Sequence, residues 1–482
     1  MRGFFYDVIR YIFKLFFWLK NMKNFLCILL LISPLYSFAE DNIQKIFVEI
    51  KSSDWKIYPL ISVGEYPLKK NYRLVGVPDG LGVLKEDNLK LSIYMNHEIA
   101  LDKGLPRAHG ATGAFVSQWL LDLNLLKIVS GQDLIKKVMI WNREKKMFEI
   151  SSHQNLNRLC SADLPDKSAF FNPKNKKGFD GRIFMSGEED REGGRAFAHI
   201  ISGEEKGVSY ELPYLGKFSW ENVVAHPYTK DKTIVMGMDD NKEGQIYLYM
   251  GNKQSKGNPV EKAGLMYGKL FGIKTNADKF ELVDLDDVSS LSGSDLEKKG
   301  TDSNITRFKR PEDGAWDTLD PNVFYFTTTD KIDGDSEIIK LTFNDINHPE
   351  SGGSIEPILK ARDIGAQMFD NLTVSDNGKI LINEDPGDHE HLASVWDFNP
   401  KTKVAQKIFE VKPEYFQDKS HPNFLTMDEE HSGVIDITRH VTHAPWSKKS
   451  ERYFLGTLQI HKKLDDPELV EGGQLYLISG PK

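Results

Sequence analysis

Short hydrophobic segments recur along this chain, and many of them end in a carboxylate. Examples are "LKLSIYMNHE" at 89–98, "GRIFMSGEE" at 181–189 and "GKILINEDP" at 378–386, each bounded by Gly, Asp, Asn or Pro. The pattern is typical of β-strands separated by turns. Further segments of this kind lie at 232–240, 244–251, 322–330, 393–400, 452–459 and 472–480. Strand–turn–strand units repeated in this way predict a β-propeller, whose innermost strands point their ends at one central channel.

The length fixes the expected number of blades. A chain of 482 residues can form a single propeller, and the usual ~40–50 residues per blade predict about six blades. We therefore expect an all-β, six-bladed β-propeller with helical and loop insertions. One insertion is a helix within 113–137 and another is a polar loop near 284–305. The helix is predicted because four apolar residues share one helical face: Phe115, Trp119, Leu120 and Leu123.

The N-terminus has the features of an export signal. We predict that residues 1–39 are an N-terminal extension plus a secretory signal peptide, and that 40–482 form a single propeller domain. The signal starts at Met22, continues through an apolar run at 25–32, and ends at Ala39 with small residues at cleavage spacing. An uncleaved membrane anchor is the alternative, but the apolar run is short for a bilayer span. The expected location is the periplasm or the outside of the cell, with no membrane span after cleavage.

Charge and cysteine content narrow the chemistry. The net charge of −8 argues against a nucleic-acid partner or an anionic membrane surface. Cleavage of the signal removes Cys27 and leaves Cys160, so no intrachain disulfide can form. A lone cysteine is usually a small buried apolar residue. The neighbours of Cys160 are polar and instead indicate a loop or strand end: Asn157, Arg158, Ser161 and Asp163.

The carboxylates that end the strands are expected to meet. They are Glu98, Glu188, Glu189, Asp239, Asp240, Asp330, Glu384 and Asp385. Carboxylates packed within a few ångströms repel one another and raise their own pKa values unless cations neutralise them. Oxygen ligands in such numbers favour Ca²⁺, whereas a thiolate such as that of Cys160 indicates a softer or redox-active ion, iron or zinc.

The segment "TRFKRPEDGAWD" at 306–317 combines Arg310 with Glu312 and Asp313. An arginine beside metal-binding carboxylates is not itself a metal ligand, and its planar fork matches a phosphate or carboxylate substrate. A structural arginine–glutamate pair is the alternative interpretation. Among the histidines near these motifs, His461 at a strand end is the best candidate for the site.

From 96–98 to 471–480 the ordered motifs resemble the PhoX-type alkaline phosphatases, calcium- and iron-dependent six-bladed propellers of the bacterial cell envelope. "RPE" at 310–312 is the most specific match. The resemblance implies that Arg310 contacts the substrate phosphate and that Cys160 binds iron. It further implies metal binding by Glu221 in "SWENVV", Glu312 in "RPE", Asp370 in "MFDNLTV" and Glu430 in "EEHSGV", with "MGMDD" up to Asp240 as a further blade.

The chain also departs from that family. Ser161, Ala162 and Asp163 follow the cysteine where the family usually has two glutamates, so Glu188 or Glu189 is the candidate replacement. No arginine pair precedes the apolar signal, although many family members have one. These departures describe a divergent member.

The expected activity is metal-dependent hydrolysis of small-molecule phosphate esters, chiefly monoesters, by a monomer that holds Ca²⁺ and Fe³⁺. No G-x-S-x-G elbow or Walker glycine loop is present. Two alternatives stay open. One is a calcium-dependent lactonase or phytase-like propeller, and the other is a non-catalytic propeller of the envelope that binds a partner.

Overall fold

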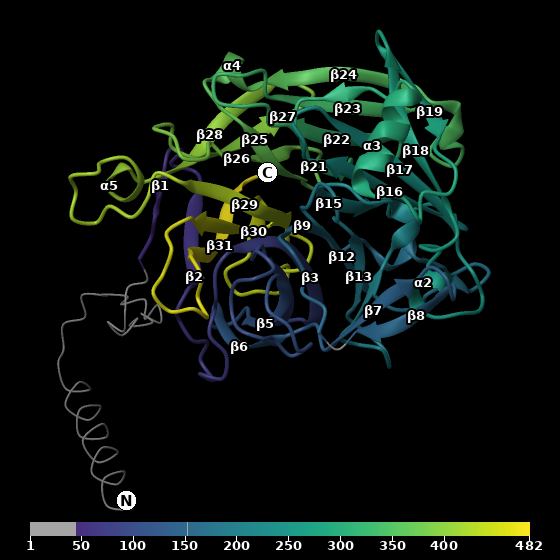
Figure 1. Cartoon of the computed structure of the whole chain (residues 1–482). Coiled ribbons are helices and arrows are strands. Elements are labelled where there is room, and N and C mark those ends of the chain that lie inside the picture. Colours follow the sequence, from purple (N-terminus) through teal and green to yellow (C-terminus); the bar gives the residue numbers. More distant parts are fainter. Residues whose placement is uncertain (1–44, 152) are drawn as a thin grey trace, which may run out of the picture. The chain divides into compact units, whose positions relative to one another are not determined.

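Six blades of mainly antiparallel strands surround a common centre in the computed structural model (Figure 1), which describes residues 45–151 and 153–482. The predicted signal peptide lies outside these residues. Within the described ranges, no helix is long and apolar enough to cross a membrane. The prediction of an all-β, six-bladed propeller with insertions is confirmed.

In each blade the chain begins at the innermost strand and continues outward, and earlier segments of the chain add outer strands to blades 2, 5 and 6. Blade 1 contains β3 (Pro78–Asp87), β4 (Lys90–His97), β5 (Phe115–Asp122) and β6 (Lys127–Asp133). Blade 2 contains β9 (Leu159–Asp163), β12 (Ile183–Glu188), β13 (Ala196–Ile200) and β14 (Val208–Glu211), extended by β7 (Lys137–Asn142) and β8 (Met147–Ser151). Blade 3 contains β15 (Trp220–Ala225), β16 (Lys232–Asp239), β17 (Gly244–Asn252), β18 (Lys269–Asn276) and β19 (Lys279–Asp284).

The second half of the chain repeats this order. Blade 4 contains β21 (Pro311–Trp316), β22 (Val323–Thr328), β23 (Glu337–Phe343) and β24 (Gly353–Lys360). Blade 5 contains β25 (Phe369–Val374), β26 (Ile380–Glu384), β27 (Ser394–Asn399), β28 (Val404–Val411) and β1 (Val48–Ile50). Blade 6 contains β29 (Glu429–Asp436), β30 (Glu451–Ile460), β31 (Gly472–Pro481) and β2 (Lys56–Ser62).

Short elements fill the connections. The helices are α2 (Pro259–Lys262), α3 (Gly293–Asp302), α4 (Ala361–Ile364) and α5 (Pro413–Phe416), with 3-10 turns η1 (Lys167–Ala169), η2 (Pro213–Leu215) and η3 (Pro349–Ser351). The remaining strands are β10 (Phe171–Asn172), β11 (Lys177–Gly178) and β20 (Arg307–Phe308).

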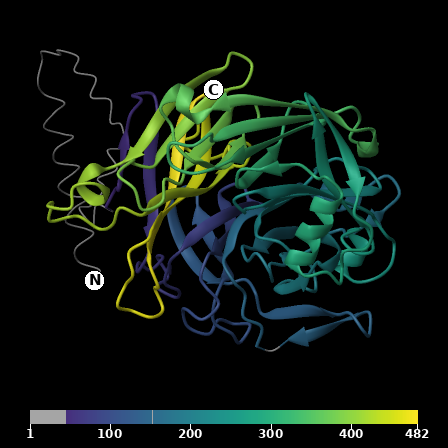
Figure 2. The same ribbon diagram turned by 45° about the horizontal axis from the view of Figure 1, so that its top comes forward.

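Strands from both ends of the described chain pair to close the propeller. β2 pairs with β31 along its length, from Lys56 opposite Ser479 to Ser62 opposite Gln474. Figures 1 and 2 show these purple and yellow strands side by side. The innermost strands β3, β9, β15, β21, β25 and β29 then contact one another in a closed cycle. We call the space that they enclose the hub.

Hydrophobic clusters lie between neighbouring blades. Successive residues of a strand point to opposite faces, so each blade presents apolar side chains to the blade before it and the blade after it. Val235 of blade 3 packs with Met185 of blade 2, for example, whereas Ile234 and Met236 pack with Phe324 of blade 4. Strands buried on both faces read as nearly continuous apolar runs, which is why they are recognisable in the sequence.

The helix predicted within 113–137 is wrong. This segment contains all of β5 and β6, joined by a turn in which Leu126 has a positive φ of 50°. The buried side chains Phe115, Trp119, Leu121 and Leu123 follow a strand period of two. Positions 115, 119 and 123 fit either period, because spacings of four residues suit both a helix and a strand. The helix α3 lies instead in the segment 284–305, where Ser292 caps its N-terminus.

We predict that Trp55 contributes strongly to the closure of the propeller between blades 5 and 6. Its buried indole lies 6.2 Å from the ring of Phe409 in blade 5 and 6.2 Å from that of Phe454 in blade 6. Trp55→Ala is expected to lower the free energy of unfolding by about 3–5 kcal/mol, measured by urea denaturation. The exposed Tyr66→Ala serves as a control and should cost little. Equal losses in the two variants would contradict this role.

Candidate metal centre

The second residue of every innermost strand carries a carboxylate or a thiol. These six residues are Asp79, Cys160, Glu221, Glu312, Asp370 and Glu430. Because the strands occupy equivalent places in their blades, the six side chains lie at one level of the hub. We call this set the ring.

A β-bulge occurs at this level in five blades, and in blade 6 it lies two residues further along β29, between His431 and Val434. In blade 3, Trp220 pairs with Asp239 and Val223 pairs with Gly237, so two residues, Glu221 and Asn222, share the space opposite one. The same one-residue shift occurs in the other five blades. A bulge re-aims side chains and is often found beside functional sites. In the five blades where the bulge includes the ring residue, it lets two consecutive residues of the innermost strand turn toward the hub.

Four of the strand-end carboxylates predicted from the sequence lie beside the ring. They follow the second strand of each blade, which runs back toward the level where the innermost strand begins. Glu98, Glu189, Asp240 and Asp385 each come directly after such a strand, and Thr329 and His461 stand at the matching places of blades 4 and 6. Two strands of each blade therefore contribute polar groups to the same mouth of the hub.

Among the described residues, four groups of ligand atoms are close enough to hold a metal ion, with all atoms of a group within 4.8 Å of one another. The groups are Asp79–Glu98–Cys160, Cys160–Glu189–Glu221, Glu221–Glu312–Asp370 and Asp370–Asp385–Glu430. Successive groups share one residue: Cys160, then Glu221, then Asp370. The groups therefore form a continuous arc around the hub, in which neighbouring ions would be bridged by a common ligand. Eight of the ligand residues are carboxylates, and one is the thiol.

Burial makes the charged forms of these groups unfavourable. It raises the pKa of Glu221 and Asp370 well above the ordinary range, and neighbouring carboxylates raise both further. Burial and Asp385 raise the pKa of Glu430 to about 7. In the described chain, the Asp79 Oδ1 atom is buried with no hydrogen-bond partner. Cations would restore the charge and satisfy this oxygen, so the donor set fits metal ions.

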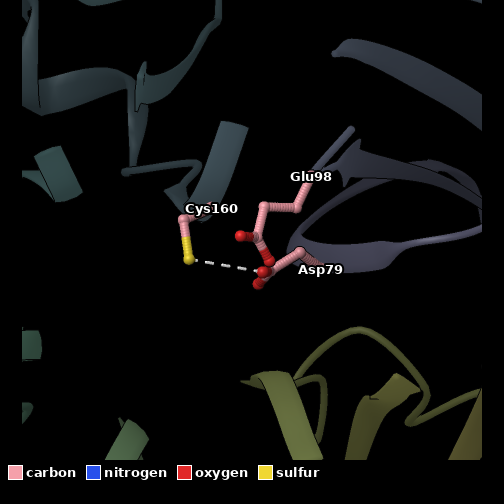
Figure 3. A group of neighbouring side chains, drawn as sticks. All are labelled: Asp79, Glu98 and Cys160. Atoms are coloured by element: carbon pink, nitrogen blue, oxygen red, sulfur yellow. Dashed lines mark hydrogen bonds between the residues drawn. The ribbon is translucent and has the colours of Figure 1, made fainter. Parts of the chain in front are cut away.

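Cys160 stands between the first two groups. Figure 3 shows its thiol beside the carboxylates of Asp79 and Glu98, with the thiol donating to Asp79 Oδ2 over 3.4 Å. Burial raises the pKa of the Cys160 thiol well above its usual value, and Asp79 and Glu221 raise it further. The thiol is therefore protonated in the metal-free chain. Binding an ion through this sulfur requires the loss of that proton.

Arg310 lies at the rim of the third group. Its Nε donates to Asp240 Oδ1 over 2.9 Å, and its Nη2 donates to Glu312 Oε1 over 2.8 Å. Burial acts against the charge, but Glu312 and Asp240 hold the pKa of Arg310 above its ordinary value. The side chain remains 29% exposed, so the guanidinium can bind both the carboxylates and a ligand at the mouth.

Two predicted metal ligands, Glu188 and Glu384, do not reach the ring. Each is the last residue of a second strand, and its side chain points away from that of the residue that follows. Glu188 accepts hydrogen bonds from the Arg195 Nε at 2.6 Å and Nη2 at 2.7 Å. Glu384 accepts from the Trp396 indole at 3.0 Å. In these two acidic pairs, only the second residue, Glu189 or Asp385, supplies a ligand atom to one of the four groups. Asp240 contacts Arg310 and belongs to none of the four groups.

Asp79 was not predicted, and Glu98 was recognised only as a strand-end carboxylate. The repeat in the sequence could have identified Asp79. Asp79 lies as many residues before Glu98 as Glu221 lies before Asp240. His461 does lie at the site. Its Nδ1 is 2.8 Å from Glu471 Oε2, and its Nε2 is 3.8 Å from Glu430 Oε2. Burial disfavours the charge, but these carboxylates raise the pKa of His461 to about 12.

A hydrogen-bonded layer crosses the hub below the ring. Ser161 donates to Glu221 Oε1 over 2.6 Å, and Asn371 donates to the Ser161 hydroxyl over 2.5 Å. Ser161 and Asn371 belong to blades 2 and 5, which are opposite one another, so this contact spans the hub. Asn222 donates to Asp313 over 2.6 Å in the same layer. Through Ser161, this layer fixes the ring carboxylate of Glu221 from below.

A cavity of about 340 Å³ lies beyond this layer, at the other end of the innermost strands. Residues of all six innermost strands line it, among them Val83, Asp163, Val224, Trp316, Val374 and Asp436. Burial raises the pKa of Asp163 to about 7, with smaller contributions from Asp313 and Asp166.

We predict that Asp163 makes stability depend on pH. Its folded-state pKa lies above the ordinary value near 4, so its contribution to stability is lost as pH rises from about 4 to about 7. Asp163→Asn keeps an acceptor for the Ala225 N–H and is expected to stabilise the fold at pH 8 by roughly 2–4 kcal/mol. Urea denaturation of metal-loaded protein at several pH values measures this effect. The exposed Asp376→Asn is the control, and an unchanged pH slope in Asp163→Asn would contradict the prediction.

Comparison with known proteins supports the fold. No family model matches the sequence, and no curated protein matches it. Among solved structures, the chain is similar to Pseudomonas fluorescens PhoX in complex with vanadate, a transition state analogue, with a TM-score of 0.61 and 12% identity over 90% of this chain and 96% of PhoX. At this identity the likeness establishes the propeller fold alone. A periplasmic gluconolactonase of Pseudomonas aeruginosa matches with a TM-score of 0.37 and 7% identity, over 84% of this chain and 89% of the lactonase.

Proposed function

We propose that this protein hydrolyses phosphate esters, chiefly phosphomonoesters, with metal ions held by the ring. The observation that carries the proposal is the arc of four linked ligand groups with the partly exposed Arg310 at its rim. Buried carboxylates repel anions unless cations are bound beside them. An arginine at the rim attracts anions. Together they describe a site for a ligand that binds cations and a guanidinium at once, as a phosphoryl group does.

The ligand types divide the proposed ions into two kinds. The groups that contain Cys160 suit a softer or redox-active ion, and we propose Fe³⁺ there. The groups Glu221–Glu312–Asp370 and Asp370–Asp385–Glu430 offer oxygen alone, and we propose Ca²⁺ there. When bound, such ions neutralise charge on phosphoryl oxygens and acidify water.

The side chains have separate roles in this proposal. Arg310 binds the phosphoryl oxygens and offsets the charge that develops on them as the ester bond breaks. Asp240 orients the Arg310 guanidinium through two hydrogen bonds, at 2.9 and 3.0 Å. Ser161, itself held by Asn371, fixes the Glu221 carboxylate from below. Because contacts are made to the phosphoryl group, we expect little selectivity for the leaving group. We further propose that the protein is an exported monomer, acting in the periplasm or outside the cell.

Metal content and substrate choice test the function together. The purified chain should contain calcium and iron by elemental analysis, and should hydrolyse p-nitrophenyl phosphate faster than a lactone. Cys160→Ser should lose iron and most of the phosphatase activity, while keeping the fold. Calcium without iron and no turnover of either substrate would reject the proposal in favour of a non-catalytic propeller. Lactone hydrolysis that survives Cys160→Ser would reject it in favour of a lactonase.

A further inference from the structure

Arg158 occupies in blade 2 the place that Arg310 occupies in blade 4. Arg158 precedes the ring residue Cys160 by two positions, and Arg310 precedes Glu312 by two. Both residues have a positive φ, 41° for Arg158 and 51° for Arg310. This backbone conformation is uncommon for residues other than glycine, so the shared value marks a shared local structure.

The backbone hydrogen bonds of the two arginines are the same. The N–H of Arg158 donates to Ile99 O over 3.1 Å, and the N–H of Arg310 donates to Asn241 O over 3.1 Å. Both acceptors directly follow a strand-end carboxylate of the preceding blade. The carbonyl of each arginine accepts from the end of the second strand of its own blade, from Glu189 N in one case and Thr329 N in the other, both at 2.9 Å.

The side chains also match. Arg158 Nε donates to Glu98 Oε1 over 3.0 Å, as Arg310 Nε donates to Asp240 Oδ1 over 2.9 Å. Each acceptor is the strand-end carboxylate of the preceding blade. Arg158 Nη2 donates to Glu189, and Arg310 Nη2 donates to Glu312. Since Nε and Nη2 make these contacts in both arginines, the Nη1 edge of each guanidinium is left for a ligand.

The side chain of Arg158 is more exposed than that of an arginine in a buried structural ion pair. The side chain of Arg158 is 46% exposed, more than that of Arg310 at 29%. Arg195, which forms the buried pair with Glu188 in the same blade, is only 16% exposed. Arg158 therefore faces the mouth of the hub, where a ligand can reach it.

Arg158 and Arg310 contact different ligand groups of the arc. Arg158 contacts Glu98 of the first ligand group and Glu189 of the second, the two groups that share Cys160. Arg310 contacts Glu312 of the third. Glu189 lies near both arginines: burial raises its pKa, and the charges of Arg158 and Arg310 act in the opposite direction. The two guanidinium groups thus flank one sector of the ring.

We propose that Arg158 is a second anion-binding residue, which binds the same tetrahedral oxyanion as Arg310 from the Cys160 side of the ring. The inference depends on the proposed function for the identity of the anion as a phosphoryl group. Two planar forks on either side of a tetrahedral anion contact different oxygens. This arrangement fixes the orientation of the anion more tightly than one arginine can.

The test measures binding of inorganic phosphate to the metal-loaded full chain by calorimetry, without turnover. Arg158→Ala is expected to raise the phosphate Kd about tenfold to a hundredfold, with a matching rise in KM for p-nitrophenyl phosphate. Arg158→Lys keeps the positive charge beside Glu98 and Glu189 but loses the fork. It should keep wild-type metal content and folding, and still bind phosphate several-fold more weakly. Arg191→Ala is the matched control, because Arg191 is exposed and pairs with Glu297.

Three results would overturn the inference. The first is a wild-type phosphate Kd in both Arg158 variants. The second is a defect in Arg158→Ala that Arg158→Lys fully restores together with metal content, because the residue would then serve charge balance alone. The third is an absence of phosphate binding by the metal-loaded wild-type protein. If phosphate binds and weakens as expected but no ester is hydrolysed, the proposed function fails and the binding role of Arg158 stands.

Discussion

Replacement of Glu221 by glutamine should abolish metal retention in the middle of the arc and lower phosphatase activity by at least about a hundredfold. Glu221 is shared by two of the four ligand groups, so its loss affects both at once. Glutamine has the same shape and can still accept the hydrogen bond from Ser161. The expected defect is therefore one of charge and ligation, read out by elemental analysis and by hydrolysis of p-nitrophenyl phosphate.

The same substitution should change stability in opposite directions with and without metal. In the metal-free chain, burial and neighbouring acids make the Glu221 carboxylate unfavourable, so the neutral amide should stabilise the fold. In the metal-loaded chain, the lost ions remove binding energy that stabilises the folded state. Thermal melting with calcium and with a chelator measures both. Asp330→Asn, a strand-end acid outside the four groups, is the control. A Glu221→Gln protein with full metal content and activity would contradict the proposed centre.

Replacement of Arg310 by alanine should lower kcat/KM for phosphomonoesters by roughly 10²–10³-fold. The residue would act on charge that develops on the phosphoryl oxygens, so kcat should fall along with kcat/KM. Removing the guanidinium also leaves Asp240 and Glu312 without their shared partner. Steady-state kinetics at matched metal content separates loss of the anion contact from loss of ions.

A nearby arginine provides the control for Arg310. Arg307 lies three residues earlier and pairs with Glu297 on α3, outside the ring. Arg307→Ala should leave kcat/KM within about twofold of wild type, because exposed pairs of this kind contribute little. If Arg310→Ala retains wild-type kinetics, Arg310 is only the structural partner of Asp240 and Glu312.

The fold could be predicted because both faces of most strands are buried. Segments such as 232–240 and 244–251 are apolar along their whole length, and turn residues separate them. The family resemblance identified five ring residues in the sequence: Cys160, Glu221, Glu312, Asp370 and Glu430. Their shared place, directly after the first residue of an innermost strand, is a finding of the structure.

The remainder of the site depended on register. In Glu188–Glu189 and Glu384–Asp385, composition does not tell which carboxylate faces the hub. The choice is made by pairing with the innermost strand, where Leu159 lies opposite Glu188 and Phe369 lies opposite Glu384. The bulges shift that pairing by one residue, and a one-residue shift reverses the face of every later side chain. Such bulges leave no clear mark in the sequence.

The cycle of innermost strands has a consequence for the order of events in biosynthesis. Asp79 belongs to the first blade and Glu430 to the last. The propeller closes when β2 pairs with β31 of the last blade. A nascent chain that has emerged only as far as blade 5 lacks both the pairing of β2 with β31 and the ligand Glu430. Ion capture at the complete centre therefore requires that blade 6 has been synthesised and that β2 has paired with β31.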